Sequence, residues 1–562
     1  MPEEAHVDEL SLPLPLYYTL TSLLNSYDMT IKLAAANVMT QYTRHFLKDD
    51  TKETNYFKIV PALCSLISRT KDVGEITVNS TWKISRKMSP TFLLSLISEN
   101  FPKVSKFLVD SNFLDQIAYI VTSNYTSDQK FLDENSLYRI SDALQVLACI
   151  GAVDENYREL IVEYDVATII VDSLSRHVAI FESLNNRTQL SPNEQLILKL
   201  SNGITLSSCY LLRSLSRSAS LMRTFLVEMH ITDPLINALR THFEGLPDDL
   251  KYDEILLKSV VLGAIANLVV EFSALKKEIV SRDLVTLLED IIDNSSYDIL
   301  RANALHVIKN SLYKEGNKQL IALFSEVVPL DKCFDLCDYP YPEIQEQCIN
   351  ILRNFSVIDC SSSGKIWTAF SAYSKEKDLK ETNFFAFLLR HLNDTKAPSI
   401  IETICYIISH FAASTLDNKI LVMRHEDVLL KLLEILKSKI PPNSTERENY
   451  ALWKVKLSII WVVINLTWKE ETVGVDNGNN NEEVEEKLDL MDVDSAINSD
   501  FENFSSAKSR ALKLIDLGFY DVVKNIGSIC NIQDIKERSR TASFQLLFYG
   551  ANISKIEATD AP

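Results

Sequence analysis

Two cysteines are spaced so that they could bind a metal ion. The segment Cys333-Phe-Asp-Leu-Cys337 puts two thiols four residues apart, on one face of a helix. A structural zinc site usually takes four ligands from two such pairs, and no second pair follows at a suitable spacing. His306 is too remote in the sequence to count as a third ligand. We therefore expect both cysteines to be core residues and predict no metal site.

Motifs of common catalytic and nucleotide-binding sites are absent. The chain contains no G-x-x-x-x-G-K-[ST], G-x-G-x-x-G, H-E-x-x-H or G-x-S-x-G pattern. No phosphate-cradling loop, zinc-binding helix or nucleophile turn is therefore indicated. We predict that the protein is not an enzyme, uses no cofactor and acts on no small-molecule substrate.

A different polar residue recurs in a regular apolar setting. Four helix-like segments each carry an asparagine with one apolar residue five positions before it and another two positions before it. The segments are VVLGAIANLVVEFS, ALHVIKNSLYKEG, CINILRNFSVIDC and IIWVVINLTWKEE, and we call their asparagines the repeat asparagines: Asn267, Asn310, Asn354 and Asn465. This shared pattern indicates an internal repeat.

The spacing of the repeat asparagines predicts the fold. They are 43, 44 and 111 residues apart, and the last interval has room for an intermediate helix without the asparagine, YIISHFAAS around Ser409. A period of about 40 to 47 residues is typical of armadillo and HEAT repeats. The 12 Gly and 16 Pro are too few for the turns of a β protein of this length. We predict an all-α armadillo/HEAT-type α-solenoid, a right-handed superhelix of stacked three-helix repeats.

Composition limits the class of protein and its partners. The formal net charge of -19 argues against a nucleic acid or an anionic membrane surface as partner. The sequence begins without a secretory signal, and no apolar run approaches the length of a membrane span. Cysteines that stand singly in apolar segments indicate reduced thiols. We expect a cytoplasmic and nuclear protein.

Changes in pattern along the chain predict its organisation. Residues 470–502 hold twelve acidic residues against one lysine and show almost no helical periodicity. A basic run follows at 536–540, and its mixed sign predicts a solvated helix face. The predicted parts are a tail at 1–14, the repeat array at 15–470, an acidic, disordered insertion at 471–505, a last repeat at 506–550 and a second tail at 551–562.

The third helices of such repeats line the inner wall of the solenoid, and residues at i, i+4 and i+7 share a helix face. An amide can bind the backbone of an extended peptide, and aromatic rings offer rigid contact area. These residue types define a predicted partner-binding groove, to which the family resemblance described below adds Gln347. The groove residues are Asn267, His306, Asn310, Tyr313, Gln347, Asn350, Asn354, Trp461, Asn465 and Trp468.

A purely structural interpretation of the same residues stays open. The repeat asparagines could instead bond to carbonyl groups of the adjacent repeat and hold the stack together, and both roles could coexist. Trp461 and Trp468 could be buried where the array ends.

The end of the chain resembles a known family. The segment Trp461–Trp468, W-x-x-x-N-L-T-W, is followed by the glycine-led apolar helix at Gly518–Val523 and by Glu537–Ala542, E-R-x-[KR]-T-A. These features resemble the C-terminal end of the armadillo-repeat subunit of the GID/CTLH E3 ubiquitin ligase. The match is specific over some 70 residues and diffuse towards the N-terminus, where the repeats diverge. The acidic insertion looks longer than in that family.

This resemblance implies a non-catalytic adaptor. Such a subunit joins an exchangeable substrate receptor to RING and CTLH scaffold subunits, and in fungi the ligase directs gluconeogenic enzymes to the proteasome. The receptor's extended tail is expected to lie in the concave groove, at the residues named above.

An importin-α-like nuclear import adaptor is the alternative. That family needs W-x-x-x-N on successive third helices, and only Trp461 with Asn465 complies. The equivalent positions are Gly263, His306 and Asn350. No basic arm precedes the array.

Overall fold

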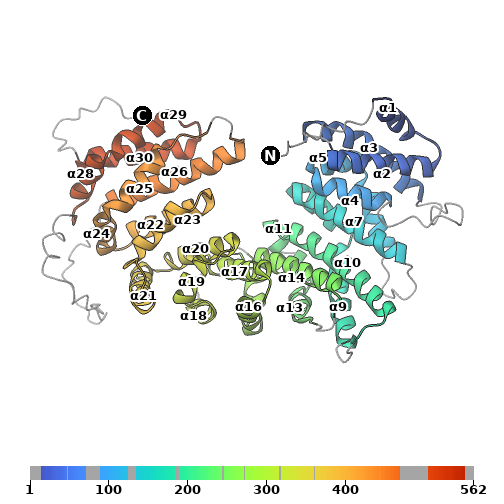
Figure 1. Ribbon diagram of the computed structural model, residues 1–562, viewed down its shortest axis with the longest axis horizontal. Coiled ribbons are helices and arrows are strands. Elements are labelled where there is room, and N and C mark those ends of the chain that lie inside the picture. Colours follow the sequence, from blue (N-terminus) through green and yellow to red (C-terminus); the bar gives the residue numbers. More distant parts are fainter. Residues whose placement is uncertain are drawn as a thin grey trace, which may run out of the picture. The chain divides into compact units, whose positions relative to one another are not determined.

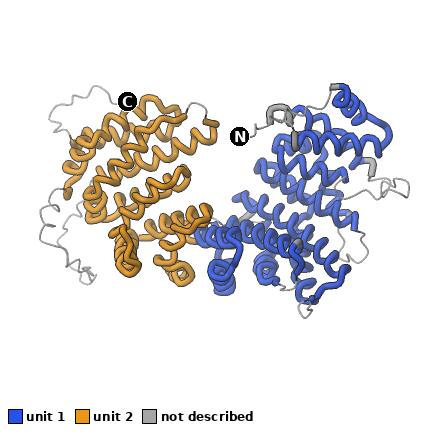
Figure 2. Tube along the Cα trace, in the orientation of Figure 1, with its two compact units in different colours: residues 1–311 blue, residues 312–562 orange. Residues whose placement is uncertain are grey.

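A computed structural model describes residues 14–46, 49–70, 89–124, 134–184, 189–223, 225–242, 246–270, 273–314, 318–359, 361–441, 444–468 and 504–550. Every regular element in these ranges is a helix (Figure 1). The chain divides into two compact units, Met1–Ser311 and Leu312–Pro562 (Figure 2). Each unit is described by itself below. The predicted insertion and both predicted tails lie almost entirely outside the described residues.

Unit 1 is built from helices that range from 4 to 24 residues in length. They are α1 (Leu14–Leu23), α2 (Met29–Phe46), α3 (Asp49–Thr70), α4 (Pro90–Asn100), α5 (Pro102–Asp110), α6 (Leu114–Asn124), α7 (Glu134–Val153), α8 (Glu155–Val162), α9 (Val166–Leu184), α10 (Pro192–Leu215), α11 (Ala219–Arg223), α12 (Phe225–Glu228), α13 (Thr232–Arg240), α14 (Asp248–Leu268), α15 (Lys276–Ile279), α16 (Arg282–Asn294) and α17 (Asp298–Leu312), whose last residue belongs to unit 2.

Unit 2 is also helical throughout its described elements. Its helices are α18 (Lys318–Val327), α19 (Leu330–Cys337), α20 (Pro342–Phe355), α21 (Ser362–Glu376), α22 (Phe384–Asp394), α23 (Pro398–Ala413), α24 (Leu416–Arg424), α25 (Glu426–Lys437), α26 (Glu446–Thr467), α28 (Ala507–Leu517), α29 (Phe519–Ile529) and α30 (Gln533–Gly550).

The long helices form the layer that carries the repeat asparagines. In unit 1, α10 packs between α7 and α14; in unit 2, α20, α23, α26 and α30 pack in succession. Small residues let α7 and α10 approach closely, since Ser141 Oγ donates to the carbonyl oxygen of Gly203 at 3.0 Å. The predicted all-α solenoid of armadillo/HEAT type is confirmed.

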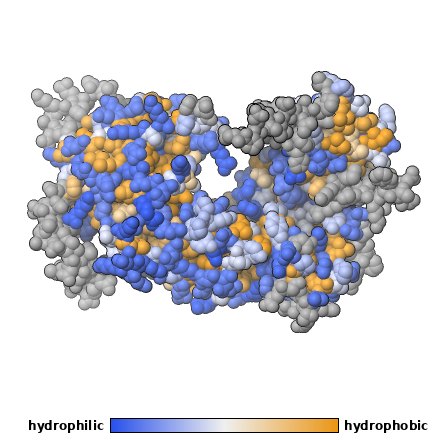
Figure 3. Space-filling view, viewed as in Figure 1, coloured by the Kyte–Doolittle hydropathy of each residue, from blue (hydrophilic) through white to orange (hydrophobic). Residues whose placement is uncertain are grey.

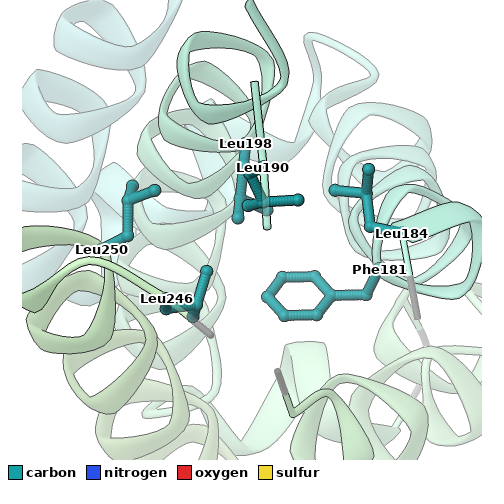
Figure 4. Close-up of a cluster of buried hydrophobic side chains, with 6 residues drawn as sticks. All are labelled: Phe181, Leu184, Leu190, Leu198, Leu246 and Leu250. Carbon is teal, nitrogen blue, oxygen red and sulfur yellow. The ribbon is translucent and has the colours of Figure 1, made fainter. Parts of the chain in front are cut away.

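Apolar side chains at helical spacing bury the surfaces between repeats. A cluster in unit 1 joins the end of α9 to the starts of α10 and α14 (Figure 4) and consists of Phe181, Leu184, Leu190, Leu198, Leu246 and Leu250. In unit 2, Phe334 on α19 meets Phe370 on α21 edge to face, with ring centroids 5.1 Å apart. Full burial of one such side chain stabilises the fold by about 1.5–3 kcal/mol. Because these side chains are buried between repeats, a repeat depends on its neighbours for its core.

Arg510 holds together the two segments that flank residues 469–503. Its fully buried guanidinium donates to the carbonyl oxygen of Leu466 at 2.6 Å and to that of Phe504 at 2.9 Å. The chain therefore leaves the end of α26 and returns to the start of α28 at one place. This geometry lets the last repeat follow α26 directly in space.

Two helices correct the expectation about membrane spans. By length and composition alone, α7 and α26 are apolar enough to cross a membrane. However, 61% and 56% of their apolar windows are buried inside the protein. Both belong to the layer of long helices, where stacking against neighbouring repeats requires an apolar surface on several sides.

The described cysteines are free thiols, and most of them are buried. Cys333 and Cys337 are both buried in α19, and Cys333 Sγ donates to the carbonyl oxygen of Cys348 at 3.4 Å. Among the described residues, no three histidine, cysteine or acidic side chains are grouped to hold a metal ion. The two cysteines are core residues, as their apolar setting predicts.

Candidate functional site

In unit 1 the repeat asparagines connect successive long helices. Nδ2 of Asn267 on α14 donates to the carbonyl oxygen of Arg213 and to Oγ of Ser216, both at 3.1 Å, at the end of α10. Nδ2 of Asn310 on α17 donates to the carbonyl oxygen of Ala266 on α14 at 2.7 Å. The amide thus reaches back one repeat in each case. It satisfies oxygen acceptors at the end of the preceding long helix, where the last carbonyl groups lack partners within the helix.

The same pattern of hydrogen bonds between successive long helices recurs in unit 2. Nδ2 of Asn465 on α26 donates to the carbonyl oxygen of Ser409 at 3.1 Å and to its Oγ at 3.0 Å. The intermediate helix α23 carries a histidine instead, and Nδ1 of His410 shares a hydrogen bond of 2.7 Å with Oγ of Ser356 at the end of α20. The helix that lacks the asparagine therefore keeps the link to the preceding repeat.

The side-chain amides of Asn267, Asn310 and Asn465 link successive long helices, and we call them the linking amides. Each donates a hydrogen bond to the preceding repeat but accepts none from the residues that the structure describes. Within the described residues, Oδ1 of Asn267, Asn310 and Asn465 receives no hydrogen bond, and each side chain is only half-buried. A carbonyl oxygen at such a surface can accept an N–H group from an extended peptide. The stacking role is therefore present at these three positions, and it leaves room for the predicted binding role.

The predicted residues of α20 have fewer free acceptor atoms. Asn354 is only 2% exposed, and its Oδ1 accepts a hydrogen bond from Arg353 Nη2 at 3.4 Å. Asn350 uses both ends of its amide, because Nδ2 donates to the carbonyl oxygen of Glu346 at 2.8 Å and Oδ1 accepts from Thr403 at 3.4 Å. Oε1 of Gln347 is sealed from solvent and has no partner among the described residues. These three residues therefore offer a ligand few free acceptor atoms.

Two aromatic residues are the most exposed of the predicted groove residues in unit 2. Trp468 is 57% exposed and Tyr313 is 41% exposed. The carbonyl oxygen of Trp468 accepts hydrogen bonds from Lys419 Nζ and Arg510 Nη2, both at 3.3 Å. Its backbone is thus fixed by two cations while the indole faces solvent, which gives a partner a rigid apolar surface.

Trp461 has a different environment. The guanidinium of Arg538 on α30 lies 4.6 Å from the centroid of the indole ring. This is a cation–π contact between α26 and α30, which pack against each other. Arg538 also pairs with Asp534 on its own helix at 3.4 Å. The residue is half-buried, so part of it stays accessible beside this contact.

Two histidines of the long helices, His306 and His410, are uncharged near neutral pH because the pKa of each is lowered. Burial, with Lys309 and Arg213 nearby, lowers the pKa of His306 to about 4. Burial beside Arg353 lowers the pKa of His410 to about 4 in the same way. His306 therefore offers the surface of unit 1 a neutral imidazole, and its Nε2 lies 3.3 Å from Nδ2 of Asn310.

The comparison with protein families shows to which family the chain belongs. Residues 171–477 match the VID28/GID5 C-terminal domain, which is more than half of the 562 residues. The chain belongs to the VID28/GID5 C-terminal domain family. The resemblance inferred from the end of the sequence is confirmed, and all ten predicted groove residues lie inside the matched region.

Two curated relatives share this relationship. A protein named GID complex subunit 5 from Schizosaccharomyces pombe is 26% identical over 421 residues, covering 74% of this chain and 48% of the relative. A protein of the same name from Saccharomyces cerevisiae is 25% identical over 394 residues, covering 60% of this chain and 41% of the relative. The chain spans less than half the length of these relatives.

Solved structures show more distant likeness. An engineered protein from the Northeast Structural Genomics Consortium aligns over 94% of this chain and 98% of its own, with a TM-score of 0.47 and 13% identity. A designed armadillo repeat protein aligns over 56% of this chain and 99% of its own, with a TM-score of 0.35 and 14% identity.

The sequence analysis did not predict the cationic side chains that lie beside the predicted groove residues. Arg538 and Ser539 fall in the run predicted as a solvated face, yet Arg538 covers Trp461 and Ser539 is fully buried. Arg213 lies against Gly263, where a Cβ atom would come within 3.2 Å of its Nε. A glycine four residues before a repeat asparagine was the available signal for this close approach.

Proposed function

We propose that this member of the VID28/GID5 C-terminal domain family is a non-catalytic subunit of a GID-type complex. The observation that carries the proposal is the family match over 171–477, which contains the row of linking amides. Both curated relatives bear the name of a GID complex subunit. The protein's part is to hold other proteins together rather than to perform chemistry, and it needs no cofactor.

The surface of α26 supports binding of an extended partner segment. Asn465 presents Oδ1 at a half-buried position, and Trp468 follows it at the end of the same helix. A peptide N–H can bond to the amide while an apolar side chain of the partner packs on the indole. In Figure 3, polar and charged residues with apolar ones between them cover the visible face of unit 2, which suits a partner with both kinds of side chain.

The finer assignment follows the resemblance noted in the sequence. The extended segment is the tail of the ligase's substrate receptor, and the protein links that receptor to RING and CTLH scaffold subunits. The substrates are metabolic enzymes of gluconeogenesis destined for the proteasome, and the protein works in the cytoplasm and the nucleus.

The test is a native purification of the tagged full chain from its own cells, followed by quantitative mass spectrometry. We expect RING-domain and LisH/CTLH-type subunits in amounts comparable to the tagged chain. Recovery of importin β with diverse nuclear cargo instead would overturn the proposal in favour of an import adaptor.

A substitution on α26 tests the binding surface itself. Trp468→Ala is expected to reduce the recovered receptor by about tenfold or more, because large exposed aromatic residues often dominate binding energy, and to leave the scaffold subunits unchanged. Tyr450→Ala is the matched control, since Tyr450 lies at the start of the same helix and is 53% exposed. Equal receptor recovery from both variants would place the receptor elsewhere.

A further inference from the structure

A pocket of about 480 Å³ lies between the last two helices of the chain. Its lining residues repeat at helical spacing, so each set lies on one face of its helix. They are Lys524, Gly527 and Ser528 on α29, and Lys536, Ser539, Arg540 and Ser543 on α30. Three cations and three hydroxyl groups therefore surround one pocket, and no carboxylate is among the lining residues.

The three cations have no counterion among the residues that the structure describes. Within the described residues, neither Lys524, Lys536 nor Arg540 forms an ion pair. The acidic residues of α30 contact other groups, because Asp534 pairs with an arginine on another face and Glu537 accepts a hydrogen bond from a glutamine. Like charges around one pocket repel each other. The chain has a net charge of -19, so its composition does not favour three cations around one pocket.

Two hydroxyl groups at the pocket also lack partners. Ser539 is fully buried, and its Oγ has no hydrogen-bond partner among the described residues. Oγ of Ser543 is likewise sealed from solvent without a partner. Gly527 permits the close approach of α29, since a Cβ atom there would lie 3.2 Å from Cβ of Ser539. Buried hydroxyl groups are normally satisfied, so a ligand that accepts hydrogen bonds would complete this site.

We propose that this pocket binds a phosphoryl group carried on a serine or threonine side chain of a partner protein. A phosphorylated side chain has a charge of about -1.5 to -2 and three strong acceptor oxygens. These requirements match three cations and the hydroxyl donors, whereas a carboxylate brings one charge and two oxygens. The proposal does not depend on the proposed function of α26, because the pocket belongs to α29 and α30.

The experiment measures binding of a fluorescein-labelled glycine-serine peptide with one phosphothreonine to the full chain, by fluorescence anisotropy. We expect Lys536→Ala with Arg540→Ala to raise the dissociation constant at least about tenfold, because hydrogen bonds to charged groups each contribute about 1.5–3 kcal/mol. The matched control is Lys375→Ala with Lys380→Ala, which removes two exposed lysines at and just beyond the end of α21. That control is expected to leave the dissociation constant unchanged.

The outcomes separate the possible sources of the phosphoryl group. Competition by inorganic phosphate at a dissociation constant well above that of the peptide supports the proposal. Inorganic phosphate that binds as tightly as the peptide would overturn the partner-protein source. An unchanged affinity in the Lys536→Ala, Arg540→Ala variant, with the unfolding midpoint of the wild type, would overturn the pocket assignment itself.

Discussion

The helices α20 and α26 share one sequence pattern but end in different surroundings. Each carries a repeat asparagine, and each is capped one residue past its end, by Ser356 in α20 and by Trp468 in α26. Asn354 of α20 is buried, whereas Asn465 of α26 is half-buried and Trp468 is exposed. The same template therefore gives a buried asparagine in one repeat and a half-buried one in another, although the residues three positions further on, Val357 and Trp468, are both exposed.

The two helix ends also have different hydrogen-bond partners. The end of α20 is met by a neutral imidazole, that of His410, at Oγ of Ser356. The end of α26 is met by two cations, Lys419 and Arg510, at the carbonyl oxygen of Trp468. Cations at a helix C-terminus interact favourably with its dipole. Both hydrogen bonds use the backbone of Trp468, and its side chain is exposed.

The largest effect is expected at Arg510. Its replacement by alanine removes a fully buried guanidinium and leaves the carbonyl oxygens of Leu466, Trp468 and Phe504 without this donor. We expect the free energy of unfolding of unit 2 to fall by about 3–5 kcal/mol, because each buried acceptor left unsatisfied costs about 1–3 kcal/mol. Urea unfolding followed by circular dichroism measures it.

Arg510→Lys is the control for charge. A lysine keeps the positive charge but cannot form the fork of hydrogen bonds, so we expect a loss between those of the wild type and Arg510→Ala. A lysine variant as unstable as the alanine variant would mean that geometry alone matters at this end. A loss below about 1 kcal/mol for Arg510→Ala would remove the contrast between the two helix ends.

Asn465 is the next test. Asn465→Ala removes the donor to the carbonyl oxygen and Oγ of Ser409, and we expect a loss of about 1–2 kcal/mol in the free energy of unfolding. Asn465→Asp should cost more, since a carboxylate cannot donate and faces a carbonyl oxygen. Urea unfolding at pH 7.5 compares the two variants. Equal stability of wild type and Asn465→Asp would show that the amide does not link α26 to α23.

The end of α20 should respond to acid. The pKa of His410 is lowered from 6.5 to about 4, so below pH 6.5 the unfolded chain binds a proton that the folded chain does not. The free energy of unfolding therefore falls as the pH falls from 6.5 towards 4. Between pH 7.5 and 5.5 we expect the wild type to lose about 1 kcal/mol more than His410→Gln. Parallel losses in both proteins would assign the acid response to other groups.

Much of the fold follows from the sequence because it depends on apolar periodicity. The recurrence of an asparagine with apolar residues five and two positions before it identifies α14, α17, α20 and α26. It also identifies α23, whose histidine stands one position after the place of the asparagine. The exposure of Trp468 did not follow from the sequence, because the apolar residues that precede it are compatible with a buried position. The structure shows that Trp468 is exposed.

The surroundings of the site were harder to predict. Arg538, Arg510 and Lys419 come from other repeats, and their contacts depend on how those repeats stack. A mixed-sign run such as 536–540 has the composition of a solvated face, yet its residues lie against Trp461 and around a pocket. Single-sequence patterns describe one helix face at a time and contain no information on which side chain of a distant repeat will meet it.

The smallest effect on stability is expected at Trp468, and it bears most directly on function. The indole is exposed, and the hydrogen bonds at this residue use its carbonyl oxygen, which alanine retains. Trp468→Ala should therefore change the free energy of unfolding by no more than about 0.5 kcal/mol while reducing recovery of the receptor. Urea unfolding of this variant beside Tyr450→Ala measures the first part. A loss above about 2 kcal/mol would mean that the indole packs within the fold, and reduced binding would then report a damaged helix end rather than a lost contact surface.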